Sequence, residues 1–265
     1  MNKQPSIKLI VATHKECTVP NDNMYIPVHV GAACSKQALP YTRDNTGDHI
    51  SSRNPVFCEL TGLYWAWKNL DCDWLGLVQY RRFFASGIKE KHIISEDELI
   101  PLLNHYKIFV PRKRHYYIET VYSHYDHTFD GHQFDVVRQI ISDKHPDYLS
   151  DFDHFMNQRS AYLFNMMIMP RNLLDQYCSW LFDILFELEK QIDTTNMSAF
   201  EKRYAGRVSE RLFNVWLIHH LRIGTLQKRD IKELPYIYFE KINWWEKCTG
   251  FLKAKFFGEK YKASF

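Results

Sequence analysis

The sequence lacks both the long apolar runs of membrane-spanning proteins and the paired cysteines of zinc and redox sites. No segment reaches the roughly 18–20 apolar residues that a spanning helix needs, and the first apolar run is too short for the core of a signal peptide. None of the 6 cysteines has a partner at C-x-x-C spacing, so neither a zinc site nor a redox motif is indicated. We therefore expect a cytoplasmic protein, soluble or peripheral to a membrane, with reduced thiols.

Glycine, proline and an excess of one charge are also scarce. With 10 Gly and 10 Pro in 265 residues, collagen-like and low-complexity classes are excluded. The net charge of +3 is too small to argue for nucleic-acid binding, and we expect no nucleic-acid partner. No Gly-x-Gly-x-x-Gly, P-loop or Gly-x-Ser-x-Gly motif occurs, which leaves dinucleotide enzymes, P-loop kinases and serine hydrolases without support.

Aromatic residues, by contrast, are abundant: 7 Trp, 16 Tyr and 18 Phe make up 15% of the chain. Such an excess is typical of a large core combined with an amphipathic surface or a sugar-stacking site. Residues 241–265 contain seven of these aromatic residues together with six Lys and two Glu, which gives the segment a net charge of +4. This mixture indicates a segment that lies on an anionic membrane surface. The alternative is a C-terminal helix packed on the domain, or a disordered end.

Strand-like and helix-like segments alternate along the chain. The β-branched run Ile7–Thr13 predicts a buried first strand, and Ser95 with Glu98 three residues later predicts a capped helix start. Further strands are expected at 74–79, 107–110, 163–169 and 237–239. Helices are expected from Asn54 and at 93–103, 117–125, 133–142, 173–191 and 208–220. This alternation predicts an α/β fold with a mostly parallel central sheet flanked by helices.

A polar cluster follows the predicted strand at 74–79 and consists of Gln79, Tyr80, Arg81 and Arg82. Ligands of open α/β sheets bind at the carboxyl ends of the strands, and the guanidinium fork of arginine suits phosphate oxygens. We therefore interpret Arg81 and Arg82 as candidate phosphate ligands. A pair of surface arginines near the sheet edge is the alternative.

A second basic cluster opens the predicted helix at 208–220. Arg207 and Arg211 are four residues apart and so share a helix face, with Glu210 beside them. A helix N-terminus attracts anions through its free N–H groups, and a carboxylate held there could orient a hydroxyl or act as a base. A solvated Arg–Glu–Arg face is the alternative.

Two acidic groups are weaker candidates. Asp71 and Asp73 have the Asp-any-Asp spacing with which nucleotide-sugar transferases hold a divalent metal. They precede the strand at 74–79, however, whereas a ligand site follows a strand, so a polar turn is the favoured interpretation. A second group matches no zinc spacing and is interpreted as a polar loop; it contains His124, Asp126, His127, Asp130, His132 and Asp135.

Several segments together resemble a known bacterial family. They are IKLIVATHKE, YIPVHVGA, DNTGDHIS, NPVFCELTGLYWAWKNLDCDWLGLVQYRRFF, LFNMMIMPRNLLDQYCSWLFDIL and GRVSERLFNVWL, in matching order from about Ile7 to Ile218. The family comprises glycosyltransferases of bacterial capsular polysaccharide and exopolysaccharide synthesis. It was first catalogued as a domain of unknown function, and its members include β-galactofuranosyltransferases.

The resemblance implies a GT-A-like single domain over residues 1–240, followed by the basic aromatic tail 241–265. It implies an inverting glycosyltransferase of capsule, exopolysaccharide or O-antigen synthesis. The expected donor is a UDP-sugar, UDP-galactofuranose in particular, and the expected acceptor is a lipid-linked oligosaccharide. The enzyme would then act as a peripheral protein on the inner face of the cytoplasmic membrane. The alternative is a non-catalytic, membrane-associated scaffold of a polysaccharide assembly complex, in which Arg81 and Glu210 would lie apart.

Inverting transfer needs a base for the acceptor hydroxyl and positive charge for the leaving diphosphate. Glu210 is the leading candidate for the base, followed by Asp130 and Asp135. The donor and its diphosphate are expected to contact Thr13, His14, Tyr80, Arg81, Arg82, Asn165, Arg207 and Arg211. A loop at the donor or acceptor site would contain Asp44, Asn45, Thr46, Gly47 and Asp48. Because the arginines would partly or wholly replace a metal, no cofactor is expected, and Mg²⁺ or Mn²⁺ is the alternative.

Overall fold

One main sheet organises the part of the chain that the structure describes. The computed structural model describes residues 4–87 and 91–239. Its strands are β1 (Ile7–Thr13), β2 (Tyr25–His29), β3 (Thr42–Arg43), β4 (Trp74–Gln79), β5 (Arg82–Ser86), β6 (His92–Ile93), β7 (Ile108–Pro111), β8 (Arg114–His115), β9 (Ser160–Ala161), β10 (Met167–Pro170), β11 (Ile231–Leu234) and β12 (Tyr236–Tyr238). The main sheet has the order β11-β7-β10-β4-β1-β2-β3, with β5, β6 and β12 attached beside this path, and β8 pairs with β9 separately.

The central pairings are mostly parallel, as the alternation of strands and helices predicts. β1 pairs in parallel with both β2 and β4, β2 pairs in parallel with β3, and β11 pairs in parallel with β7. Only β10 interrupts this pattern along the path, because it runs antiparallel to both β4 and β7. The carboxyl ends of β1 and β4 therefore lie side by side at one edge of the sheet, which is where ligands of such sheets bind.

The first strand shows why the sheet is covered on both faces. Its side chains alternate, so Ile10 and Ala12 join one hydrophobic cluster with helix residues such as Leu63, whereas Leu9 and Val11 join a second cluster on the other face. An apolar run without polar alternation is what a strand buried on both faces requires.

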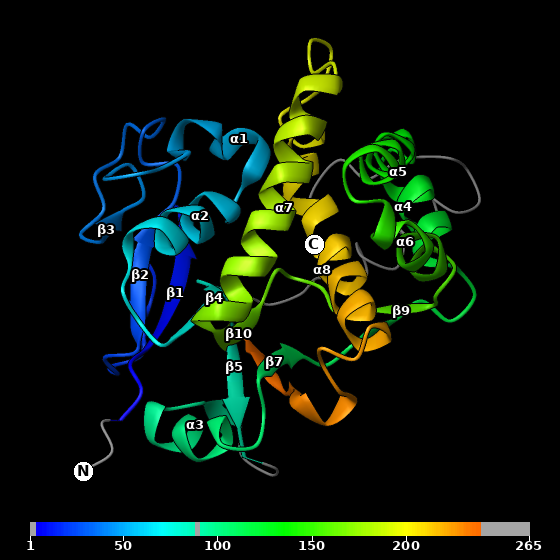
Figure 1. Ribbon diagram of the computed structural model, residues 1–265. Helices are drawn as coiled ribbons and strands as arrows, with labels where there is room; N and C mark the ends of the chain where they lie inside the picture. The colour runs from blue at the N-terminus through cyan, green and yellow to red at the C-terminus, as the bar shows by residue number, and fades with distance from the viewer. Residues whose placement is uncertain (1–3, 88–90, 240–265) are drawn as a thin grey trace.

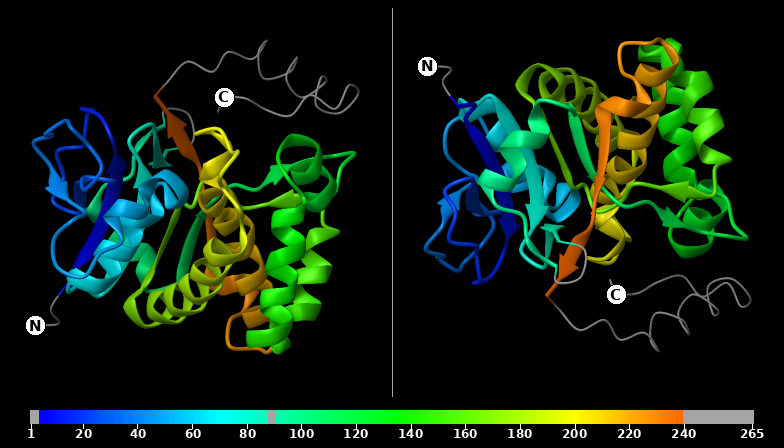
Figure 2. Two further views of the ribbon diagram at one scale, coloured as in Figure 1. Left: turned by 90° about the horizontal axis from the view of Figure 1, so that it is seen from above. Right: turned by 90° about the horizontal axis from the view of Figure 1, so that it is seen from below.

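The helices are α1 (Asn54–Phe57), α2 (Leu60–Asn69), α3 (Glu96–Leu103), α4 (Val121–Thr128), α5 (His132–Lys144), α6 (Leu149–Met156), α7 (Arg171–Gln191) and α8 (Tyr204–Arg222). Figure 1 shows α7 and α8 between the sheet on one side and α4, α5 and α6 on the other. The views from above and from below in Figure 2 show the same arrangement. The described residues therefore form a single domain in which α7 and α8 join the sheet to a helical lobe.

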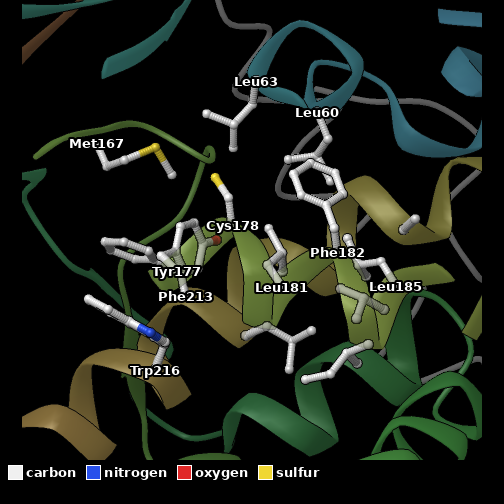
Figure 3. Packing of buried hydrophobic residues seen from close by; sticks show 14 of the residues in the cluster. Leu60, Leu63, Met167, Tyr177, Cys178, Leu181, Phe182, Leu185, Phe213 and Trp216 are labelled. Carbon is white, nitrogen blue, oxygen red and sulfur yellow. The ribbon is translucent and has the colours of Figure 1, made fainter. Parts of the chain in front are cut away.

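The long helix α7 supplies much of the larger core. Its buried residues recur at helical spacing, and they include Tyr177, Cys178, Leu181 and Leu185. Figure 3 shows this face packed between side chains of α2, such as Leu63, and side chains of α8 that include Phe213 and Trp216. This packing fixes α8, and with it the predicted basic cluster, against the sheet.

Two local predictions need correction. The strand expected at 163–169 begins only at Met167, because Phe164 and Asn165 adopt left-handed backbone with φ of 76° and 52°. The helix expected at 117–125 begins at Val121, after a capping box on Thr120. Helix α6 and strands β2, β5 and β11 are among the elements that the sequence analysis did not predict. The capping box of Ser95 with Glu98 is confirmed at the start of α3.

Within residues 4–87 and 91–239, no helix combines the length and the apolar character needed to cross a bilayer. The predicted membrane-surface tail at 241–265 lies outside the described residues.

Candidate active site

A cleft of about 830 Å³ opens where β1 and β4 end and α8 begins. Arginines line it from two sides, because Arg81 and Arg82 follow β4 whereas Arg203 and Arg207 flank or open α8. The cleft is lined by Ala12, His14, Val30, Asn54, Pro55, Cys58, Glu59, Gln79, Tyr80, Arg81, Arg82, Arg114, His124, Phe129, Leu163, Phe164, Ala199, Phe200, Lys202, Arg203, Gly206, Arg207, Glu210, Arg211, Tyr236 and Tyr238. Cations therefore outnumber the two carboxylates, Glu59 and Glu210, and the cleft is suited to an anionic ligand.

Arg82 is held rigidly on the sheet side of the cleft. Its guanidinium lies 4.3 Å from the ring centroid of Phe164 and 4.7 Å from that of Tyr238. Its Nη1 donates a hydrogen bond of 2.6 Å to Oε1 of Gln79. Burial, and then repulsion by Arg81, lowers the pKa of Arg82. A cation that has lost its hydration gains strongly from an anionic partner, so Arg82 is a preorganised anion ligand.

Arg207 has a similar environment on the helical side. Its guanidinium lies 4.4 Å from the ring centroid of Phe129 and 4.9 Å from that of Phe200. Its Nη1 and Nη2 donate to the main-chain oxygens of Phe200 and Glu201, both at 2.8 Å. Burial lowers the pKa of Arg207 as well. Each side of the cleft thus presents one arginine that aromatic rings hold in place.

Glu210 lies on α8, three residues after Arg207, and lines the same cleft as both arginines. Its Oε1 accepts the main-chain N–H of Phe164 at 3.0 Å, and its Oε2 lies 2.6 Å from Nη1 of Arg211. The side chain is 18% exposed, whereas that of Arg211 is only 5% exposed. Burial raises the pKa of Glu210, and Arg211 opposes this effect. A fixed carboxylate with a raised pKa has the property that a general base needs near neutral pH.

Glu59 is a second carboxylate of the cleft, which the sequence did not single out. Its Oε1 accepts Nε2 of Gln79 at 3.0 Å and Nδ2 of Asn165 at 2.9 Å. In the sequence Glu59 is an ordinary polar position next to a helix, and no local pattern separates it from a surface glutamate. Only its contacts across 106 residues to Asn165 reveal its place.

Strained backbone surrounds this network. Besides Phe164 and Asn165, Cys58 has a positive φ, of 52°. Non-glycine residues in this region cost energy and are concentrated at functional sites. Asn165 stabilises its own turn, because Nδ2 also donates to the oxygen of Gly206 and Oδ1 accepts from Ser209, at 2.9 and 2.8 Å. Asn165 therefore lies behind the cleft and holds α8 against the turn before β10.

The first strand contributes His14 and, indirectly, Thr13. His14 lines the cleft and packs edge-on to Tyr80, with ring centroids 5.3 Å apart. Thr13 is buried and does not line the cleft; its Oγ1 donates to the oxygen of Lys15 at 2.5 Å and so shapes the turn that carries His14. Of the expected donor ligands, His14, Tyr80, Arg81, Arg82, Arg207 and Arg211 share the cleft lining.

The lower-ranked base candidates lie outside the lining. Oδ1 of Asp130 accepts the main-chain N–H of His132 at the start of α5, at 3.2 Å. Oδ1 of Asp135 accepts the hydroxyl of Tyr122 at 3.1 Å. Neither carboxylate belongs to the residues that line the cleft.

The loop expected at the donor or acceptor site also lies outside the cleft lining. Asp44 is fully buried and accepts the main-chain N–H groups of Gly31 and Ala32 and the hydroxyls of Ser51 and Thr61, at 2.5–3.0 Å. The remaining members hold the loop against its neighbours: Asn45 accepts from Arg43, Thr46 from Trp65 and Asp48 from Tyr64, while Gly47 has a φ of 60° beside Asn69. Asp44 is thus the centre of a buried hydrogen-bond network.

Replacing Asp44 with Ala should lower the free energy of unfolding by about 3–5 kcal/mol, because four buried donors lose a charged acceptor. Asp48 is exposed and its carboxylate accepts one hydrogen bond, of 3.2 Å, so Asp48→Ala should change stability by less than about 0.5 kcal/mol. Urea unfolding followed by circular dichroism measures both changes. Equal effects of the two substitutions would contradict a central role for Asp44.

The Asp-any-Asp pair lies at the other end of β4. Asp71 and Asp73 precede the strand, and Oδ2 of Asp73 accepts the main-chain N–H of Ser6 at 2.7 Å. Neither belongs to the cleft lining, which follows the carboxyl end of the strand. Among the described residues, no three His, Cys, Asp or Glu side chains are grouped so that they could hold a metal ion.

Two comparisons with known proteins found similarities. The sequence model of the family DUF4422, a domain of unknown function, matches residues 8–221. The solved apo structure of WbbM, named as a bifunctional glycosyltransferase, has a TM-score of 0.80 and 30% sequence identity to this chain. The match covers 89% of this chain and 46% of that chain, so this chain spans about half the length of the WbbM chain. A search of curated proteins gave no significant match. The likeness to WbbM confirms the predicted GT-A-like fold.

Proposed function

The chain belongs to the DUF4422 family, and we propose that it is a glycosyltransferase that uses a nucleotide-sugar donor. The observation that carries the proposal is the cleft, in which immobilised Arg82 and Arg207 lie on two sides and Glu210 has a raised pKa. A nucleotide sugar offers such a cleft a diphosphate for the arginines. With the diphosphate bound there, the anomeric carbon of the sugar would lie near a carboxylate that can take a proton. The likeness to WbbM supports the same reaction class.

The proposed reaction is a single displacement with inversion. The acceptor oxygen forms a bond to the anomeric carbon while the bond from that carbon to the diphosphate oxygen breaks. The hydroxyl proton passes to the carboxylate of Glu210, and the leaving diphosphate takes the electron pair of the broken bond. Arg81, Arg82 and Arg207 stabilise the charge that develops on the diphosphate. Because these groups are held in place beforehand, little reorganisation is needed during the reaction.

The donor that we propose is UDP-galactofuranose, and the proposed acceptor is a lipid-linked oligosaccharide of capsule, exopolysaccharide or O-antigen synthesis. The support is the sequence resemblance between about Ile7 and Ile218. Aromatic rings that line the cleft, such as Tyr80 and Tyr236, supply faces on which a base or a sugar ring could stack. An acceptor that stays in the bilayer would place the enzyme on the inner face of the cytoplasmic membrane.

A panel of UDP-sugars tests the proposal directly. We expect UDP-galactofuranose to bind most tightly in calorimetry and to be consumed when a lipid-linked acceptor is added. UDP alone should bind, since the arginines recognise its diphosphate. A well-folded protein that binds neither UDP nor any UDP-sugar would contradict the proposal.

The non-catalytic scaffold makes a different geometric prediction. It requires no convergence of Arg81 and Glu210, yet both line the same cleft. Their convergence favours the enzyme over the scaffold, and the transfer assay decides between them.

We propose that transfer requires no metal, because arginines provide the positive charge at the cleft. Activity should therefore fall by less than about twofold in excess EDTA, since no resident cation has to be displaced. The measurement is the initial rate of transfer with and without EDTA. Loss of activity that Mg²⁺ or Mn²⁺ restores would favour the metal-dependent alternative.

The acid side of the pH profile should report Glu210. A base acts only when deprotonated, so kcat/KM should be constant at high pH and fall about tenfold per unit once the pH is below the pKa of Glu210. Because burial raises that pKa, the fall should begin above the ordinary range of a glutamate. The measurement is kcat/KM from pH 4 to about pH 9. A profile that stays flat down to the ordinary pKa of glutamate would contradict the assignment.

A further inference from the structure

A turn between β8 and α4 exposes two large apolar side chains to solvent. Tyr117 is 80% exposed and Ile118 is 66% exposed, more than any other large hydrophobic residue that the structure describes. In both views of Figure 2 the segment between β7 and α4 lies at the outer edge of the molecule. An isolated exposed side chain is common, but two adjacent ones at the end of a protruding turn form a compact apolar tip.

The surrounding structure holds this tip outward. Tyr117 has a left-handed φ of 58°, and the N–H of Ile118 donates to the oxygen of Tyr116 at 2.7 Å. Tyr116 itself is buried, and its ring centroid lies 4.4 Å from that of His124. Arg159 accepts the N–H of Tyr116 at its main-chain oxygen, and its side chain donates to the oxygen of Tyr117. Strained backbone of this kind persists only where the surroundings enforce it.

Basic residues precede the tip in the sequence. Arg112, Lys113, Arg114 and His115 are consecutive and all exposed. Arg159, on the neighbouring segment, is exposed as well. The only carboxylate among residues 112–119 is Glu119, which is buried at 4% exposure and lies 2.8 Å from His127. The exposed residues of the segment 112–118 are therefore three cations and a histidine followed by an apolar end.

We propose that this turn docks on an anionic lipid bilayer. The ring of Tyr117 would lie at the level of the headgroups, Ile118 would enter the acyl boundary, and the cations would contact lipid phosphates. Nucleic acid offers the cations the same phosphate chemistry, but it offers an aliphatic tip such as Ile118 no hydrocarbon to enter. A bilayer satisfies both parts of the surface, which is why it is the partner to which the turn is assigned.

The elements on either side of the turn border the cleft. Arg114 of β8 is exposed and lines the cleft, as does His124 of α4, whose ring packs against that of Tyr116. Docking would therefore bring the cleft close to the membrane surface, where a lipid-linked acceptor remains. In this respect the inference rests on the proposed function. The turn is distinct from the tail at 241–265, which is present in every variant of the test below.

Cosedimentation with vesicles tests the proposal on the full chain, without donor or acceptor. We expect binding to vesicles of phosphatidylcholine with phosphatidylglycerol and weaker binding to phosphatidylcholine alone. The substitutions Tyr117→Ser and Ile118→Ser together should lower the partition coefficient at least about tenfold, because two apolar side chains lose their burial. Arg112→Gln together with Lys113→Gln should also lower the partition coefficient about tenfold. Added salt should reduce this difference between the wild type and the variant.

Ile223 provides the matched control. It is 48% exposed at the far end of α8, away from the end that lines the cleft, so Ile223→Ser should leave vesicle binding within about twofold of wild type. Circular dichroism checks that each variant is folded, and exposed positions should tolerate these changes. Vesicle binding that is equal in the wild type and the Tyr117/Ile118 variant would overturn the proposal. Failure of the wild type to bind vesicles would overturn it as well. So would a Tyr117/Ile118 variant that loses binding to an RNA oligonucleotide but keeps its binding to vesicles.

The two proposals fail separately. The vesicle assay contains no nucleotide sugar, so a catalytically inactive protein can still dock. An enzyme that uses a water-soluble acceptor can lose docking and keep its turnover.

Discussion

Glu210→Gln should reduce kcat by about 10²- to 10⁴-fold while leaving the fold intact. The amide keeps the size of the side chain, and its oxygen can still accept the main-chain N–H of Phe164, which Oε1 accepts at 3.0 Å. Its NH₂ group then replaces the oxygen that pairs with Nη1 of Arg211, so circular dichroism is needed to check that the variant is folded. It cannot take a proton from the acceptor hydroxyl, so the loss should appear in kcat more than in donor affinity. Transfer rates and calorimetric binding of UDP, measured on the same preparation, separate the two effects.

Glu119→Gln is the matched control for this substitution. Glu119 is 4% exposed and lies 2.8 Å from His127, but it does not line the cleft. Loss of this carboxylate should lower the stability of the protein and leave kcat unchanged. A second comparison, Glu59→Gln, distinguishes the two carboxylates of the cleft. A folded Glu210→Gln protein with normal turnover would disprove the assignment, and a larger loss in Glu59→Gln would transfer the role of base to Glu59.

Arg82→Lys should reduce kcat/KM by about 10²-fold, although the charge is retained. The flat guanidinium fits between Phe164 and Tyr238 at 4.3 and 4.7 Å, and its Nη1 is fixed by Gln79. An ammonium group is compact and strongly hydrated, so it cannot present a planar fork to a diphosphate from the same place. Steady-state kinetics with the donor varied would measure the change.

Arg138→Lys controls for the general effect of replacing an arginine. Arg138 is 50% exposed and pairs with Asp153 on the surface of the helical lobe, so its replacement should leave kcat/KM unchanged. Arg82→Met, which keeps much of the apolar stem without the charge, separates packing from electrostatics. If Arg82→Lys retained the kcat/KM of the wild type, Arg82 would not be a ligand of the diphosphate.

The local predictions succeeded where neighbouring residues determine the outcome. The run Ile7–Thr13 has apolar side chains on both faces of the strand and is therefore buried on both. Ser95 and Glu98 form a capping box within the first turn of a helix, so they need no distant partner. Failures occurred where distant contacts override local preference. Leu163 to Met169 reads as a continuous strand, yet Asn165 instead forms a left-handed turn because Glu59, Gly206 and Ser209 bind its amide.

The loop at 44–48 illustrates the same limit for the site. A polar, turn-rich loop is typical of a ligand-binding segment, and Asp44 looks the same in sequence whether it faces a ligand or the interior. In the structure Asp44 is buried by donors from three separate segments, at Gly31, Ser51 and Thr61. No local pattern in the sequence shows that those donors lie close to Asp44. The sequence could therefore single out Asp44 as a polar loop residue but could not predict that it is buried.

The sequence by itself determined the α/β class and the chemical character of two basic clusters, since periodicity, capping and charge are properties of neighbouring residues. The tertiary structure alone decided that Arg82 and Arg207, 125 positions apart in the numbering, line one cleft together with Glu210, and that Glu59 contacts Asn165. It also decided that Tyr117 and Ile118 are exposed, because burial depends on what the rest of the fold places over a residue.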